Sequence, residues 1–281
     1  MSKREIDIEF LKKLALFVYE SISPIIGTKE AAKKIKRGAG GDISMHIDIM
    51  AEKIIINELK KNNINIMLIS EEVGELIIGD KEIVKKNEEK LIVDPIDGSN
   101  NSIRDIPFFC VSIAYAKGSE INDVDKAVIL NLKTKDIYWA EKGKGAFFNE
   151  EKIIRSENSS LDKLIFEIDL KLSEAAENFK KFSSVLNKIY RIRVMGCVAL
   201  SFCLFAKGCI DGYINLKERM RVVDIAAAFL IVKESGGLIF SRGGEDLNIS
   251  LSMESIPPLI ACRPNLKHLI KKELKKIHSL E

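Results

Sequence analysis

An apolar run that ends in two carboxylates is the strongest chemical signal in this sequence. The run reads Leu91, Ile92, Val93, Asp94, Pro95, Ile96, Asp97, Gly98 and Ser99. Pro95 keeps Asp94 extended, and Gly98 lets the backbone come close to a ligand. Ser99–Arg104 is placed to open a helix whose first amides point at an anion. The run therefore suits two oxygen ligands beside a phosphate cradle, although a simple Asp-Pro-x-Asp-Gly turn is the alternative.

Three further groups of carboxylates occur at comparable places. Glu71 and Glu72 follow an apolar run directly, and adjacent acids at a strand end repel unless a cation or a base joins them. Asp48 stands at the start of an expected helix, where a capping role is the simpler interpretation. Asp224 lies in the apolar stretch Val222–Val232 and needs a partner, a metal or a place in the first helical turn.

Carboxylates at the ends of strands and the starts of helices suit a site for several Mg²⁺ ions. Mg²⁺ takes oxygen ligands, keeps waters and is completed by substrate phosphate. His46 is expected to be a surface or capping residue, and Ser99 has no neighbouring His, which disfavours a Ser-His-Asp triad. The sequence lacks the P-loop pattern, so phosphate transfer from ATP through that fold is not supported.

The first half of the chain must supply the elements that position these acids. Leu11, Leu14, Ala15 and Tyr19 form a helical stripe, and a second helix is expected over Asp48–Lys61. The basic run Lys33–Arg37 with its following glycines is expected to be a flexible loop. Strands are expected at Ile64–Ser70, Leu91–Val93, Cys110–Ala116, Val124–Leu130 and Asp136–Ala140.

The second half alternates strands and helices, which suggests a covered sheet. Expected strands are Leu164–Ile168, Arg191–Val194, Tyr213–Leu216 and Leu238–Phe240, and expected helices are Ser173–Leu186, Val198–Lys207, Val223–Ser235 and Asn265–Ile277. We expect residues 1–150 to form an N-terminal half that carries most metal ligands. Residues 151–281 would form a C-terminal half that carries Asp224 and the residues that bind the substrate.

Composition excludes several classes of protein. The 281 residues carry 44 basic and 41 acidic side chains, a net charge of +3, which argues against a general nucleic-acid binder and a disordered acidic protein. The longest apolar stretches are shorter than the ~20 residues that span a bilayer, and the N-terminal residues mix charges, so we expect a cytoplasmic protein without a membrane segment. Five cysteines without a C-x-x-C pair indicate buried free thiols.

Taken together, the blocks resemble the inositol monophosphatase family, the lithium-sensitive, magnesium-dependent phosphatases that include fructose-1,6-bisphosphatases. They occur in the family order, and only their combination is specific. The matching residues are Gly41-Asp42, Asp48, Ala51-Glu52, Ser70-Glu71-Glu72, Asp94-Pro95-Ile96-Asp97-Gly98-Ser99, Asn101, Gly196-Cys197-Val198-Ala199-Leu200, Ala206-Lys207-Gly208, Asp211, Val223-Asp224-Ile225-Ala226-Ala227 and Glu234-Ser235-Gly236-Gly237. The resemblance implies an α/β (α+β) fold, a layered α-β-α-β-α sandwich. It also implies hydrolysis of a phosphomonoester with two or three Mg²⁺ ions, for which Mn²⁺ could substitute.

The resemblance assigns the metal ligands residue by residue. Glu71 and Asp94, with the carbonyl of Ile96, would hold the first ion. Asp94, Asp97 and Asp224 would hold the second.

The resemblance also assigns roles around the reacting water and the phosphate. Asp48 would sit by the attacking water and a third, weaker metal, with Glu72 as a base or orienting group. Ser99 stands where the family usually has Thr and would orient that water. The amides of Gly98 and Ser99 would hold the substrate phosphate, and the segment that contains Gly196 and Cys197 is expected to contact the substrate.

The substrate is indicated by the stretch before Asp224. Animal-type members have a glutamate that contacts the inositol ring seven residues before this aspartate, and here that position is Lys217. Archaeal dual-activity members, which have a basic segment there, resemble the chain better. Lys217, Arg219 and Arg221 could bind the second phosphate of fructose 1,6-bisphosphate, and Arg193 is a further candidate. A solvated loop of alternating charges is the alternative for at least one of them.

We therefore expect a phosphatase of fructose 1,6-bisphosphate, inositol 1-phosphate or both. The expected partners are a small phosphate ester and a second copy of the chain, with no nucleic acid and no membrane. A 3′-phosphonucleotide or NADP phosphatase of the same superfamily is a second candidate, although such enzymes tend to have Lys where this chain has Asn100. A regulatory or RNA-associated protein built on the same fold is a third.

Overall fold

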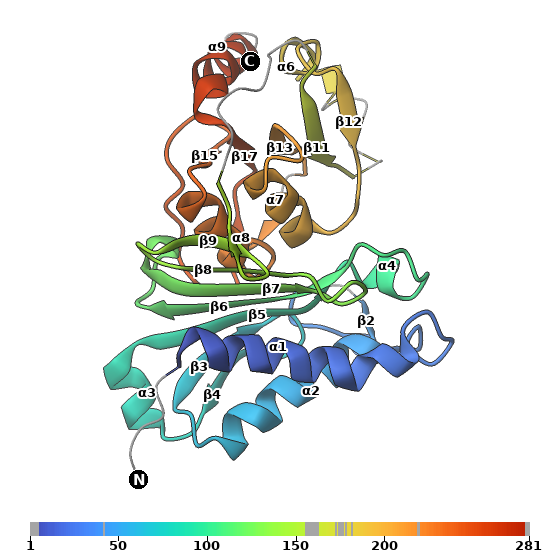
Figure 1. Cartoon of the computed structure of the whole chain (residues 1–281), viewed down its shortest axis with the longest axis vertical. Coiled ribbons are helices and arrows are strands. Elements are labelled where there is room, and N and C mark those ends of the chain that lie inside the picture. The colour runs from blue at the N-terminus through green and yellow to red at the C-terminus, as the bar shows by residue number, and fades with distance from the viewer. Residues whose placement is uncertain are drawn as a thin grey trace.

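The chain folds into alternating layers of helices and sheets. The computed structural model describes residues 6–41, 43–154, 163–171, 173, 177, 179–180, 182–217 and 220–278. Figure 1 shows α1 (Ile8–Ile22) and α2 (His46–Lys61) on one face of the first sheet, and α7 (Val198–Ala206) and α8 (Val222–Glu234) on its other face. A second sheet follows, with α6 (Ser183–Leu186) and α9 (Lys267–His278) outermost. The predicted α-β-α-β-α sandwich is confirmed.

The first sheet has eight strands within the described residues, in the order β10-β9-β8-β7-β6-β5-β3-β4. Their bounds are β3 (Ile66–Ser70), β4 (Gly74–Ile78), β5 (Glu89–Asp97), β6 (Cys110–Lys117), β7 (Val124–Asn131), β8 (Ile137–Glu141), β9 (Gly145–Phe148) and β10 (Glu151–Lys152). β3 and β5 are parallel neighbours, and Ser70 pairs with Val93. The residues that follow this pair, Glu71 and Asp94, therefore emerge at the same edge of the sheet.

The second sheet has five strands within the described residues, in the order β12-β11-β13-β17-β15. Their bounds are β11 (Ile165–Asp169), β12 (Arg191–Arg193), β13 (Gly212–Asn215), β15 (Leu238–Ser241) and β17 (Leu259–Cys262). β11 runs parallel to both β12 and β13, whereas β17 is antiparallel to β13 and β15. A small antiparallel pair joins β14 (Met220–Arg221), which directly precedes α8, to β16 (Ser255–Ile256), which follows β15.

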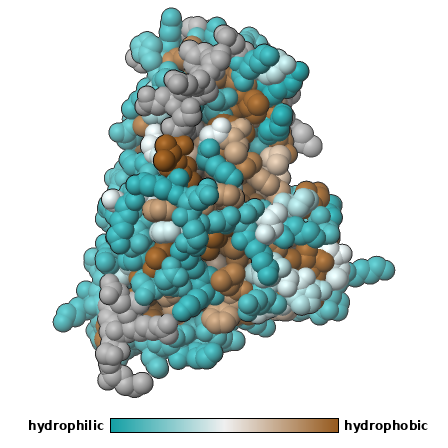
Figure 2. Space-filling model, viewed as in Figure 1, coloured by the Kyte–Doolittle hydropathy of each residue, from teal (hydrophilic) through white to brown (hydrophobic). Residues whose placement is uncertain are grey.

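Three hydrophobic clusters hold the layers together. One lies between α1, α2 and the first sheet, the second surrounds α7 and α8 between the two sheets, and the third lies between the second sheet and α9. Every side chain of α8 from Val222 to Val232 is buried, because protein covers this helix on all sides. Polar residues cover most of the face in Figure 2, where hydrophobic residues appear only in small separate areas. Within the described residues, no helix combines the length and apolar character that crossing a membrane requires.

Several local expectations were wrong or incomplete. The segment expected to be a flexible loop forms the strand β1 (Lys34–Arg37), which pairs with β2 (Ile43–Met45) in a hairpin. The sequence analysis also missed β4 and the helix α3 (Lys81–Asn87). Of the five cysteines, Cys209 is exposed, whereas the others are buried as expected. The expected helix Ser173–Leu186 lies partly outside the described residues, and its last turn is α6.

The remaining short elements connect the main ones. They are η1 (Ser23–Ile25), α4 (Ser99–Ser102), η2 (Ile121–Asp123) and η3 (Pro264–Leu266). The first sheet ends with β10 and the second begins with β11, on either side of a segment that is mostly outside the described residues. The division into functional halves near residue 150 stays a prediction.

Candidate active site

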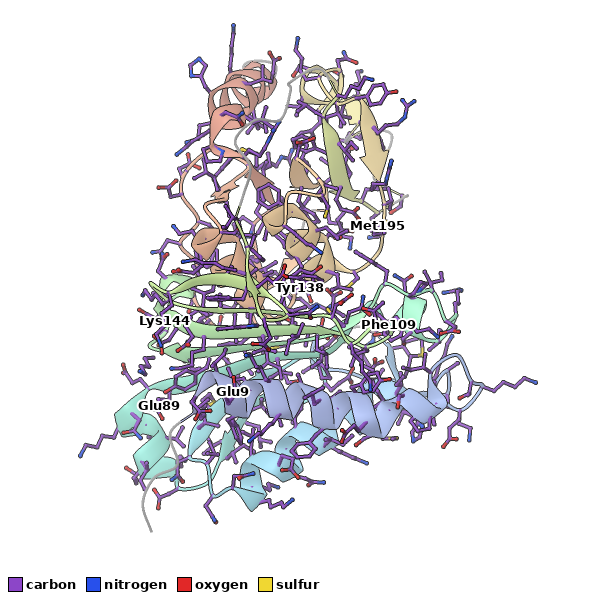
Figure 3. The ribbon with its side chains drawn as sticks, in the orientation of Figure 1. Glu9, Glu89, Phe109, Tyr138, Lys144 and Met195 are labelled. Carbon is purple, nitrogen blue, oxygen red and sulfur yellow. The ribbon has the colours of Figure 1, made fainter. Side chains whose placement is uncertain are left out.

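A cavity of about 490 Å³ lies where the two sheets and their helices meet. Its lining comes from β5 and the residues after β3, from the starts of α2, α7 and α8, and from β11 and β13. Figure 3 shows the side chains on either side of this junction, with Phe109 just before β6 and Met195 on the loop before α7. Residues far apart in the sequence therefore line one cavity.

The acids singled out from the sequence all line this cavity. They are Asp48, Glu71, Glu72, Asp94, Asp97 and Asp224. All are buried except Glu71, which is half-buried. Isolated buried carboxylates are costly, so their convergence requires compensation by protons, basic side chains or metal ions.

Burial and mutual repulsion raise the pKa values of Glu71, Asp94, Asp97 and Asp48. Burial is the main cause at Glu71, where the nearby Asp224 carboxylate also raises the pKa and Arg221 lowers it, with a result of about 8. Burial raises the pKa of Asp94 well above its usual range, and Glu71 and Asp97 add to the effect. The pKa values of Asp97 and Asp48 are raised by burial to about 6. A bound cation would reverse this penalty on the charged forms.

The donor set fits a hard divalent cation. Asp94 Oδ1 accepts a hydrogen bond from the amide of Ile96 at 3.1 Å. Asp94 Oδ2 and Asp48 Oδ1 are buried and have no hydrogen-bond partner in the described part of the protein. Oxygen ligands of this kind, with free lone pairs in a carboxylate-rich cavity, are those that Mg²⁺ prefers.

Asp97 is held in place from the other side of the cavity. Its Oδ2 atom accepts hydrogen bonds from the amide of Ala199 at 2.5 Å and from the thiol of Cys197 at 3.3 Å. Burial raises the pKa of Cys197 well above its usual range, so this thiol stays protonated and donates. Asp97 thus ties the end of β5 to the start of α7.

The backbone at Gly98 requires glycine. Gly98 has a φ of +89°, and a Cβ there would lie 3.1 Å from the carbonyl oxygen of Phe108 and 3.2 Å from the Cβ of Cys197. The hydroxyl of Ser99 donates to the carbonyl of Ile96 at 3.0 Å. Gly98, Ser99, Gly196 and Cys197, all predicted substrate contacts, line the cavity.

Asp48 and Glu72 lie on the side of the cavity formed by α2 and β2. Asp48 is the third residue of α2 and not its N-cap. Its carboxylate accepts a hydrogen bond from the amide of Met45 at 2.8 Å. Glu72 accepts a hydrogen bond from the hydroxyl of Ser44. The glycine-rich turn of the β1–β2 hairpin approaches the same acids, since the amide of Gly40 donates to the carbonyl of Glu71 at 2.8 Å.

Of the basic residues expected to bind a second phosphate, Lys217 and Arg221 line the cavity, and each is paired with acids. Arg221 donates to both oxygens of Asp224, at 2.9 and 3.2 Å, and to Glu71. Lys217 contacts Asp169 at 2.8 Å. Arg193 is exposed on β12, is not part of the cavity lining and donates to the carbonyl of Ile192. Arg219 lies outside the described residues.

The cavity also contains acids that the sequence analysis missed. Glu167 and Asp169 on β11 line it, and burial raises the pKa of Glu167 to about 7. The available signal was the alternation Phe-Glu-Ile-Asp within an apolar strand, which puts two acids on one face. His46 is not part of the cavity lining, and its Nδ1 lies 4.0 Å from Glu30.

Comparison with known proteins gives a consistent relationship. The sequence profile of the inositol monophosphatase family matches residues 4–279. A fructose-1,6-bisphosphatase/inositol-1-monophosphatase of Methanothermobacter thermautotrophicus is 36% identical over 92% of this chain and 93% of its own. A bifunctional NADP phosphatase/NAD kinase of Methanococcus maripaludis is 34% identical over 93% of this chain, which spans 48% of that protein. The crystal structure of an inositol monophosphatase–fructose 1,6-bisphosphatase matches with a TM-score of 0.80 at 28% identity, covering 95% of this chain and 98% of that chain.

Proposed function

Because the chain belongs to the inositol monophosphatase family, we propose that it is a magnesium-dependent phosphomonoesterase of sugar phosphates. The proposed substrates are fructose 1,6-bisphosphate and inositol 1-phosphate, the activities in the name of the relative from Methanothermobacter. The observation that carries the proposal is the convergence of six acidic side chains in one cavity beside Gly98.

The metal ions would be held as the family resemblance assigns. Glu71, Asp94 and the carbonyl of Ile96 would hold one ion, and Asp94, Asp97 and Asp224 a second. Two or three bound Mg²⁺ ions would supply a nucleophile at neutral pH and offset the negative charge of the phosphate and the leaving oxygen. Mn²⁺ offers the same preference for oxygen ligands and is proposed as a substitute.

The chain's own residues would bind the phosphate and orient the water. The amides of Gly98 and Ser99 would donate to phosphate oxygens, which explains why the backbone must come so close at Gly98. Asp48 would accept a proton of the attacking water, since its pKa of about 6 leaves it mostly ionised at neutral pH. Glu72 and the Ser99 hydroxyl would fix the orientation of that water.

A phosphate-release assay over sugar, inositol and nucleotide phosphates tests this function. We expect release that depends on Mg²⁺ and stops in chelator. Asp97→Asn should lower kcat by more than about 100-fold, because it removes a metal ligand while keeping the side chain's size. Asp125→Asn is the control, because Asp125 forms salt bridges with two lysines and lies on β7, outside the cavity lining. Full activity in chelator or in Asp97→Asn would refute the proposal.

NADP phosphatase activity is the second candidate, supported by the 34% identity to the bifunctional enzyme of Methanococcus maripaludis. Including NADP in the same assay distinguishes this activity from sugar-phosphate hydrolysis, because the kcat/KM values for NADP and for the sugar phosphates rank the substrates directly. A regulatory or RNA-associated role would instead predict RNA binding without phosphate release from any substrate. We also propose a homodimer in the cytoplasm, and sedimentation equilibrium would test the dimer.

A further inference from the structure

The wall of the cavity formed by β11 and β13 carries a cluster of polar side chains. Glu167 and Asp169 are two residues apart on β11 and therefore share a face. In the parallel register, Tyr213 lies beside Glu167 and Asn215 beside Asp169. The intervening side chains of both strands belong to the hydrophobic cluster under α9. The strands thus present one apolar face to the core and one hydrogen-bonding face to the cavity.

Asp169 is the centre of this cluster. Its carboxylate accepts hydrogen bonds from Tyr213 Oη at 3.4 Å and Asn215 Nδ2 at 3.3 Å, and it contacts Lys217 Nζ at 2.8 Å. Its side chain keeps 16% of its surface exposed and lines the cavity. An ionised carboxylate offers about four lone-pair sites and can only accept. Asp169 is therefore fixed in position and retains capacity for a hydroxyl donor from a ligand.

The charges at this wall are unfavourable for a second phosphate. Lys217 is already paired with Asp169, and Arg221 is paired with Glu71 and Asp224. Glu167 adds a second carboxylate to the same strand. A phosphate dianion placed here would meet the ionised Asp169, the buried Glu167 and a lysine whose charge is largely offset. An uncharged hydroxyl group avoids this repulsion and can donate to the remaining acceptor site of Asp169.

We propose that Asp169, oriented by Lys217, determines specificity by accepting a hydrogen bond from a free hydroxyl of a polyol monophosphate. The inference rests on the proposed function, because the phosphate must bind at Gly98 and Ser99 for the polyol to extend toward β11. It selects inositol 1-phosphate over fructose 1,6-bisphosphate, since the bisphosphate brings a second dianion to the acidic wall.

The test compares substrates with and without hydroxyls. The ratio of kcat/KM for inositol 1-phosphate to kcat/KM for p-nitrophenyl phosphate should fall about 10- to 100-fold in Asp169→Asn, the cost of losing a hydrogen bond to a charged acceptor. The ratio cancels any loss common to both substrates, such as partial misfolding. Asp125→Asn, which removes an acid paired with lysines outside the cavity, should leave the ratio unchanged.

A second variant separates hydroxyl recognition from phosphate recognition. If Lys217 orients Asp169, Lys217→Met should lower kcat/KM for inositol 1-phosphate more than for fructose 1,6-bisphosphate. A larger loss for fructose 1,6-bisphosphate would mean that Lys217 binds the second phosphate, and it would overturn the inference.

The two proposals fail in different ways. If the wild-type protein with Mg²⁺ hydrolyses none of these substrates, the proposed function is wrong. If it hydrolyses p-nitrophenyl phosphate and the substrate ratio of Asp169→Asn stays within about twofold of wild type, the proposed function stands and the assignment of Asp169 is wrong.

Discussion

At the scale of single residues, Glu167 shows how burial and hydrogen bonding compete at one carboxylate. It is buried beside Asp169, and its Oε1 atom accepts the amide of Met195 at 2.6 Å. Burial raises its pKa from 4.5 to about 7, because the loss of hydration outweighs the hydrogen bond from Met195. The folded protein therefore binds this proton more tightly than the unfolded chain does.

This pKa predicts a pH-dependent stability difference. The stabilising contribution of the proton is complete below pH 4.5 and is lost as the pH rises through about 7. Glu167→Gln keeps the acceptor for Met195 and does not titrate. Its free energy of unfolding, measured by urea denaturation, should rise relative to wild type by about 1–3 kcal/mol between pH 4.5 and 7.5. Glu82→Gln on exposed α3 is the control, and parallel curves for Glu167→Gln and wild type would contradict the prediction.

Single residues were predictable where their chemistry conflicted with their surroundings. Asp94 and Asp97 end an apolar run, and Asp224 lies in an apolar helix, so the sequence alone marks each carboxylate as one that needs a partner. Glu167 and Asp169 were missed because alternation of acids and apolar residues is also what a half-exposed strand shows. Only the pairing of β11 with β12 and β13 reveals that their polar face is turned to a cavity.

At the scale of elements, the junction between β5 and α4 combines a positive φ with close packing. Gly98 and Gly143 both have positive φ, +89° and +78°, but only Gly98 has atoms within 4 Å of the position of a Cβ. A comparison of the two glycines therefore distinguishes the cost of backbone strain from the cost of steric crowding.

Replacing each glycine with alanine measures the difference. Gly143→Ala should cost about 1 kcal/mol in the free energy of unfolding, the usual penalty for a left-handed alanine. Gly98→Ala should cost about 1–3 kcal/mol more and abolish phosphate release, because the carbonyl of Phe108 must shift. Chemical denaturation and a phosphate assay on the same samples provide the measurement. Equal costs in the two variants would show that the junction can relax.

Elements were predictable from local pattern only in part. The runs that became β6 and β7 are apolar and rich in β-branched residues, so their assignment depended on composition. The hairpin of β1 and β2 was not visible, since Lys34–Arg37 is basic and its pairing partner lies beyond a glycine-rich turn. Pairing between segments is a tertiary property that strand propensity does not encode.

At the scale of the whole molecule, the stability of the protein should depend jointly on metal and pH. In the metal-free fold Glu71 keeps its proton up to a pH of about 8, its pKa, and Asp48 and Asp97 keep theirs up to about 6. The metal-free protein should therefore lose stability as the pH rises from about 4 to about 8. Metal binding requires the deprotonated forms, so the gain from a metal should grow over the same range.

Thermal unfolding with and without Mg²⁺ tests this linkage. The increase in Tm caused by a saturating concentration of Mg²⁺ should be larger at pH 8 than at pH 5.5, because fewer protons must be displaced. Samples that contain chelator at both pH values give the metal-free baseline. An increase of the same size at both pH values would show that the acids are ionised before the metal binds.

The layered architecture came from the resemblance to a family, whereas patterns in the sequence indicated only a strand-rich half and an alternating half. The physical reason lies in α8, whose side chains from Val222 to Val232 are all buried and so show no amphipathic face to orient it. The position of α8 between the two sheets is defined by tertiary packing, in the hydrophobic cluster that surrounds the helix. Local periodicity cannot specify such a layer.

The contacts of Arg221 have a practical consequence for handling the protein. Its guanidinium lies between Glu71 and Asp224, so part of the negative charge of the pocket is neutralised from within the chain. Removing divalent ions should therefore leave a folded protein that can be stored inactive and reactivated by dialysis against Mg²⁺. During reactivation, Mg²⁺ must compete with the guanidinium of Arg221 for the same carboxylates. The arginine must therefore release Glu71 or Asp224 before that carboxylate can bind a metal ion.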